Sequence, residues 1–112
     1  MNSPDSGKLA EAVCRLRDGR VDEARQLTDV LLGEAPDLPP LLQPAAVAAL
    51  QAGDDKSALA LAAKSLRQRP AHAATLLVAG RAARNLSDVD MATDFFRSAT
   101  RAAPDLAEPE LA

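Results

Sequence analysis

Residues 53–70 read GDDKSALALAAKSLRQRP, and the skeleton of this stretch occurs three times in the chain at a spacing of 34 residues. A fixed period of this length indicates stacked two-helix units. The sequence therefore predicts an all-α array of helix–turn–helix repeats. Four columns of residues keep the spacing: a glycine column (Gly19, Gly53, Ser87), an alanine column (Ala24, Ala58, Ala92), a leucine column (Leu27, Leu61, Phe95) and a proline column (Pro36, Pro70, Pro104).

Each column has a physical function in such a unit. Glycine suits the reversal after a first helix because it tolerates a left-handed backbone. In the third copy we expect Ser87 to cap the next helix instead, with Asp90 completing a pattern similar to a capping box. The alanine column is small where two helices cross closely, and the leucine column fills the space beside it. The proline column ends the second helix, since proline lacks an amide hydrogen and restricts the preceding residue.

The pattern resembles the tetratricopeptide repeat, most closely in GRVDEARQLTDVLLGEAPD at residues 19–37. The small residue that the family carries in its first helix is present as Ala12, Ala46 and Gly80, whereas its large first-helix aromatics are missing. The resemblance implies a right-handed superhelix of three repeats and about six helices. We expect the repeats at residues 5–38, 39–72 and 73–106, with 107–112 starting an incomplete further repeat.

The apolar spacing predicts most of the helix boundaries. The exception is the start of the second repeat, where Pro39, Pro40 and Pro44 fall within six residues. That helix is either kinked or starts late, at residue 43 or 44. We favour the late start, with Leu41 and Leu42 in a short turn packed on the core. The other helices are expected at 5–18, 21–35, 54 or 55–68, 73–85 and 88–103.

Size and composition exclude several classes of protein. A chain of 112 residues predicts one domain, and its net charge of −3 lacks the basic face of a nucleic-acid-binding protein. No apolar run approaches the ~18 residues of a membrane span. The N-terminus MNSPDSGK has no basic and apolar regions of a secretory signal. These features predict a cytoplasmic protein, and the Ala- and Arg-rich composition favours a bacterial source.

The sequence carries few residues that could do chemistry. Its one histidine, His72, falls in a loop between repeats, where solvent exposure or packing explains it better than a role as a base. Its one cysteine, Cys14, lies among apolar residues, and we interpret it as a small hydrophobic side chain. No nucleophile, phosphate-binding or metal-ligand motif is present. We therefore predict no catalytic, cofactor-binding or metal-binding residue. The recurring acidic pairs at the starts of the second helices are explained by the helix dipole.

The resemblance implies that the inner faces of the first helices form a concave groove for a peptide or helix. Spacings of i, i+4 and i+7 place three residues of each helix on one face. The first two trios are mostly apolar and the third ends in two arginines, which suits an amphipathic helix with an acidic end. These residues could instead be core. Carried over by position, the groove consists of Leu9, Val13, Leu16, Gln43, Val47, Leu50, Leu77, Arg81 and Arg84.

We therefore predict a non-catalytic protein-interaction or scaffold module that binds a protein or peptide partner, or another domain of its own polypeptide. Two alternatives stay open. One is a repeat segment of a larger enzyme, such as a sulfotransferase or glycosyltransferase, and it rests on family analogy and on the end of the sequence at Ala112. The other is a self-assembling adaptor that forms a homodimer.

Overall fold

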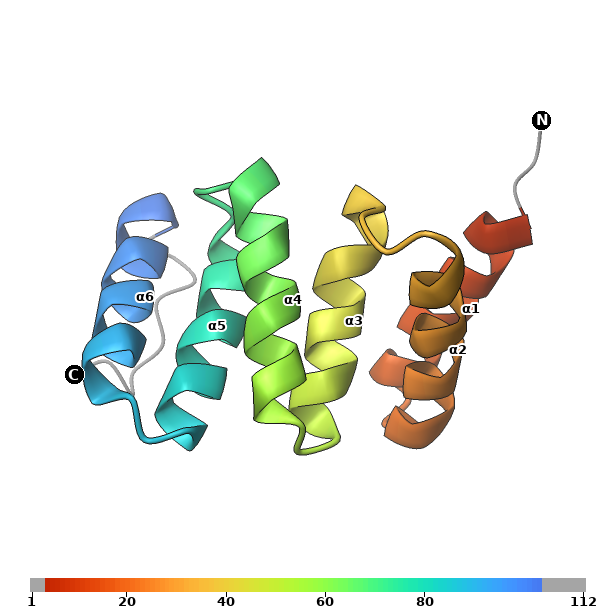
Figure 1. The fold of residues 1–112 in the computed structure, drawn as a ribbon, viewed down its shortest axis with the longest axis horizontal. Helices are drawn as coiled ribbons and strands as arrows, with labels where there is room; N and C mark the ends of the chain where they lie inside the picture. The colour runs from red at the N-terminus through yellow and green to blue at the C-terminus, as the bar shows by residue number, and fades with distance from the viewer. Residues whose placement is uncertain (1–3, 104–112) are drawn as a thin grey trace.

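A computed structural model describes residues 4–103 and the side chains of residues 7–103. Within this range six helices follow one another in a row (Figure 1). This confirms the all-α repeat fold within the described range. The start of a further repeat predicted at 107–112 lies outside the described residues. The helices are α1 (Pro4–Arg17), α2 (Val21–Glu34), α3 (Pro39–Gln51), α4 (Asp55–Gln68), α5 (Ala73–Asn85) and α6 (Val89–Ala102).

The helices pack as three antiparallel pairs, α1 with α2, α3 with α4 and α5 with α6. The second helix of each pair also contacts the first helix of the next, through α2 with α3 and α4 with α5. The first helices touch one another as well, α1 with α3 and α3 with α5. The array is therefore continuous, and its first helices lie next to one another.

Small side chains allow these close approaches. All three members of the alanine column are buried, and the members of the leucine column are half-buried. Ala58 shares one buried cluster with Ala49 of α3 and Ala82 of α5, so the fully buried side chains where these three helices meet are all alanines. Because the apolar contribution scales with the area removed from water, each of these contacts buries little and depends on the helices staying close.

The glycine column reverses the chain within each repeat. Gly19, Gly53 and Ser87 have positive φ angles of 79°, 85° and 67°, so all three adopt the left-handed conformation. The expectation that Ser87 caps α6 is therefore wrong. Ser87 takes the glycine's place in the turn, and Asp88 caps α6 by accepting a hydrogen bond from the Met91 backbone N–H at 3.1 Å.

Replacing Ser87 with glycine should stabilise the protein, because a side chain in the left-handed region costs roughly 1–2 kcal/mol that glycine avoids. The reverse substitution, Gly53→Ser, is the matched control and should destabilise it. A Cβ at Gly53 would meet no atom within 4 Å, so only the backbone conformation opposes the change. Denaturant unfolding followed by far-ultraviolet circular dichroism measures both effects. Equal midpoints for wild type and Ser87→Gly would contradict the assigned turn.

The helix α3 starts at Pro39, so the predicted late start is wrong. Pro39 and Pro40 occupy the first two helical positions, where amide hydrogens have no helical acceptor. Leu41 and Leu42 lie in the helix and are fully buried. Their burial contributes about 1.5–3 kcal/mol each. This offsets the ~3 kcal/mol that a proline inside a helix, here Pro44, costs. The prediction that both leucines pack on the core is confirmed.

The third repeat fills its core differently from the other two. The small residues Ala12, Ala46 and Gly80 are all buried, but a Cβ added at Gly80 would lie 2.6 Å from Cε1 of Phe96. Phe96 is 6% exposed and occupies the space that the glycine leaves. Phe95 is half-buried and packs against two neighbouring buried clusters. Of the two adjacent phenylalanines, Phe96 therefore enters the space between the paired helices.

Gly80→Ala should destabilise the protein even though alanine favours helices by about 1 kcal/mol over glycine. Overpacking costs about 1–3 kcal/mol, and the flat ring of Phe96 leaves no room for the methyl group. The same substitution should become neutral or stabilising in a Phe96→Leu background, a non-additivity that urea unfolding of the four proteins measures. Gly33→Ala is the matched control, because that glycine lies in α2 with open space around it and should gain stability. A gain for Gly80→Ala equal to that for Gly33→Ala would refute the close contact.

Candidate functional site

The structure places the nine predicted groove residues on α1, α3 and α5, three on each helix. Eight are half-buried and Arg84 is exposed. Since α1 contacts α3 and α3 contacts α5, the three trios occupy equivalent positions on neighbouring helices. The first helices thus repeat the same three positions along the array.

The apolar members of the set lie between core and surface. Val47 and Leu50 pack against the buried cluster that contains Ala46 and Ala79, and Leu77 packs against the cluster that contains Phe96. None of the three is fully buried. One part of each side chain therefore supports the core while the rest stays accessible, so a partner that covered them would remove further apolar surface from water.

Arg84 points away from the other groove residues, toward α6. Its guanidinium carbon lies 5.8 Å from the centroid of the Phe96 ring, within the range of a cation–π contact. Arg84 also lines a surface hollow whose other described lining residues all belong to α6. The third trio is therefore divided between two surfaces.

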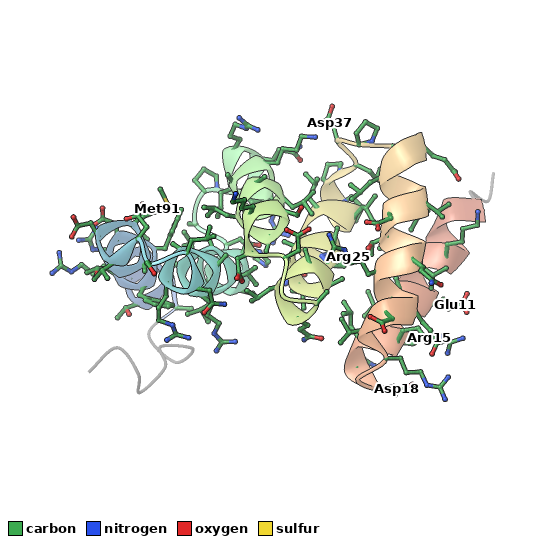
Figure 2. The ribbon with its side chains drawn as sticks, turned by 60° about the horizontal axis from the view of Figure 1, so that its bottom comes forward. Glu11, Arg15, Asp18, Arg25, Asp37 and Met91 are labelled. Atoms are coloured by element: carbon green, nitrogen blue, oxygen red, sulfur yellow. The ribbon has the colours of Figure 1, made fainter. Side chains whose placement is uncertain are left out.

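An ion pair joins the first repeat to the second. Arg25 reaches from α2 toward the next repeat (Figure 2) and donates a hydrogen bond through Nη2 to Oδ2 of Asp54. The other carboxylate oxygen of Asp54 accepts from the backbone N–H of Ser57 at 3.2 Å and so caps α4. The hydrogen bond from Arg25, helped by that from Ser57, lowers the pKa of Asp54 to about 2. The same contact raises the pKa of Arg25. One carboxylate thus both starts a helix and ties two repeats together.

A lysine makes a second tie between these repeats. Lys64 of α4 donates to the backbone carbonyl of Pro36 at 3.0 Å and lies 2.8 Å from Oδ1 of Asp37. Its hydrogen bond and its charge lower the pKa of Asp37. The loop that ends the first repeat is therefore held from the second helix of the next.

Asp54→Asn should lower the thermal midpoint at neutral pH, since asparagine retains a cap but loses the charge that pairs with Arg25. The folded-state pKa of Asp54 lies below its unfolded value of about 3.9. Its stabilisation is therefore present above about pH 4 and is lost as the pH falls toward 2. The midpoints of wild type and variant should converge over that range. Asp88→Asn likewise retains the cap and removes a charge, but Asp88 has no arginine partner in the described part of the chain, so this change should cost less at neutral pH. A gap between wild type and Asp54→Asn that is constant with pH would count against the ion pair.

The interpretation of Cys14 as a packed hydrophobic side chain is wrong, because Cys14 is exposed. One and two repeats later the same position holds Ala48 and Ala82, which are buried in the array. No helix precedes α1 among the described residues, so no described helix covers Cys14 as α2 and α4 cover the other two positions. Figure 2 shows Glu11 and Arg15, which flank Cys14 in α1, at this end of the row.

His72 is half-buried at the N-cap position of α5. Its Nδ1 lies 2.7 Å from Oγ1 of the buried Thr75. Burial, together with the charge of Arg69, lowers the pKa of His72. This environment fits packing against the start of a helix.

Among side chains 7–103, no group of three or more His, Cys, Asp or Glu residues could hold a metal ion. Within 4–103, no helix combines the length and the apolar character needed to cross a membrane.

The hollow beside Arg84 was not predicted from the sequence. Its residues Thr93, Phe96 and Thr100 stand one repeat after Leu59, Ala62 and Leu66, which lie on α4 at or near a buried cluster shared with α5. The 34-residue period could therefore have located the hollow as the α6 counterpart of the α4 surface that contacts α5.

Comparison with known proteins gives likeness in structure alone. No protein-family model matches the chain, and no curated protein matches it. The D159K mutant of MamA matches with a TM-score of 0.82 and 24% identity, over 91% of this chain and 59% of that one. TTC0263, a thermophilic TPR protein in Thermus thermophilus, matches with a TM-score of 0.75 and 22% identity, over 89% of this chain and 57% of that one.

The chain thus spans less than two thirds of each of these structures. The two likenesses agree with the 34-residue period, the six helices and the left-handed turns in the middle of the repeats. Together they show that the chain has the tetratricopeptide-repeat fold.

Proposed function

We propose that the protein is a non-catalytic interaction module that holds a segment of a partner in the groove formed by its first helices. The observation that carries this proposal is the repetition of half-buried side chains at equivalent positions of α1, α3 and α5. Stacked repeats commonly present such extended surfaces to their partners. The partner segment belongs to another protein or to a further domain of the same polypeptide.

The chemistry of the groove suits an amphipathic helix. Leu9, Val13 and Leu16 from α1 and Val47 and Leu50 from α3 offer apolar surface to the helix. At the α5 end, the half-buried Arg81 adds positive charge to the groove. An amphipathic helix lying in an apolar groove is an established mode of peptide recognition.

Val47→Asp should weaken partner binding at least about tenfold, because it places a charge against the apolar face of the bound helix. The probes are helical peptides with an apolar stripe and an acidic end, selected from a displayed library and measured by fluorescence anisotropy. Val30→Asp is the matched control, because Val30 lies on the second helix α2 and is 51% exposed. It should leave binding unchanged.

Two measurements keep this test interpretable. Circular dichroism of Val47→Asp shows whether the variant folds, since Val47 also packs against the core. Amide chemical-shift mapping on the unmodified protein needs no substitution and should place the peptide on α1, α3 and α5. Shifts confined to α2, α4 and α6, or equal affinity of both aspartate variants, would overturn the proposal. Light scattering of the free protein tests the homodimer alternative directly.

A further inference from the structure

A hollow of about 630 Å³ runs along α6, at the opposite end of the row from α1 (Figure 1), and Arg84 of α5 also lines it. We call it the end hollow. Its floor includes the ring of Phe96, and Val89, 67% exposed, adds apolar surface at one end. Around this floor lie Arg84, Thr93, Arg97, Thr100 and Arg101.

The repeat geometry indicates what shape of ligand the end hollow fits. In the preceding repeat the equivalent residue of Phe96 is Ala62, which shares a buried cluster with Val78 and Ala79 of α5. In the first repeat, the equivalent face of α2 contacts α3 in the same way that α4 contacts α5. Each earlier face of this kind therefore holds a helix, and the helix on α4 presents Val78 and Ala79 there.

The charges around the hollow indicate which helix would fit. Arg97 and Arg101 are one turn apart on α6, and neither contacts a carboxylate within residues 7–103. In the first repeat, by contrast, Arg15 and Arg25 each pair with acidic side chains. Two arginines at the edge of an apolar floor can form bidentate hydrogen bonds with carboxylates.

A long polyanion does not suit the same surface. Asp90 and Asp94 are exposed on α6, and the whole chain carries a net charge of −3. Nucleic acid binding depends on a continuous basic face. Separate carboxylates on one helix can meet the arginines and avoid these aspartates.

We propose that the end hollow is a second docking site, separate from the groove, for a helix of a partner protein whose stripe of alanine and leucine is flanked by glutamates. The apolar stripe lies over Phe96, where a helix of a following repeat would lie. The flanking glutamates pair with Arg97 and Arg101. A partner bound here leaves the groove open, so the module can hold two partner segments at once.

The test uses a designed helical peptide about as long as α6 (14 residues), with an Ala/Leu stripe flanked by glutamates, and a second peptide with lysine at each glutamate position. Fluorescence anisotropy against the full chain should show the glutamate peptide binding at least about tenfold more tightly than the lysine peptide. The double variant R97E/R101E should reverse this preference. R67E/R69E is the matched control, because it makes the same change in net charge at exposed residues at the end of α4. It should keep the wild-type preference.

Several results would overturn the proposal. One is equal binding of the two peptides, or a preference that R97E/R101E does not change. A full chain carrying E108K/E110K that binds the glutamate peptide about tenfold more tightly would show that residues 104–112 occupy the hollow. A wild-type dimer that R97E/R101E converts to a monomer would assign the hollow to a second copy of the chain.

The outcome is independent of the groove. Val47→Asp lies on α3, away from the end hollow, and should leave binding of the glutamate peptide unchanged. Loss of binding in that variant, with its fold retained, would place the peptide in the groove and would count against a second site.

Discussion

The close approach of helices at small side chains is the constraint on which the structure depends. Ala58 forms a buried cluster with Ala49 and Ala82, and Gly80 leaves the room that Phe96 fills. Protein interiors are packed as densely as organic crystals, so a methyl group more or less at such a contact shifts whole helices. In a repeat array the shift passes to the next unit, because each repeat contacts only its neighbours.

Because the core consists mostly of small side chains, interactions outside the core matter more for how the repeats are held together. Arg25 and Asp54 join the first repeat to the start of α4, and Lys64 holds the loop at Pro36 from the same helix. Surface ion pairs usually contribute little. These two interactions differ from most surface pairs because each fixes the position of a helix start or of a loop end. Without them, the backbone alone would hold the angle between the repeats less firmly. The spacing of the groove trios on α1 and α3 depends on that angle.

The 34-residue period in the sequence was sufficient to predict the number, order and pairing of the helices. It also predicted five of the six helix spans to within a residue or two. The start of α3 was missed because rules for single prolines ignore the burial of Leu41 and Leu42, which offsets the loss of one hydrogen bond. Ser87 was misread because serine favours helix caps, while the turn geometry of the repeat needs a left-handed residue there. In both cases the fold overrode a local preference.

The same reasoning limits what a period can say about function. The repeat pattern assigns the same role to Cys14, Ala48 and Ala82, yet Ala48 and Ala82 are buried and Cys14 is exposed. The pattern does not show whether a neighbouring helix covers a given position. At the other end, Phe96 and Arg97 replace Ala62 and Ala63, and both line the end hollow. The middle of the array is thus constrained by packing and could be predicted. The residues of α1 and α6 that no described helix covers have to be interpreted from charge, exposure and shape.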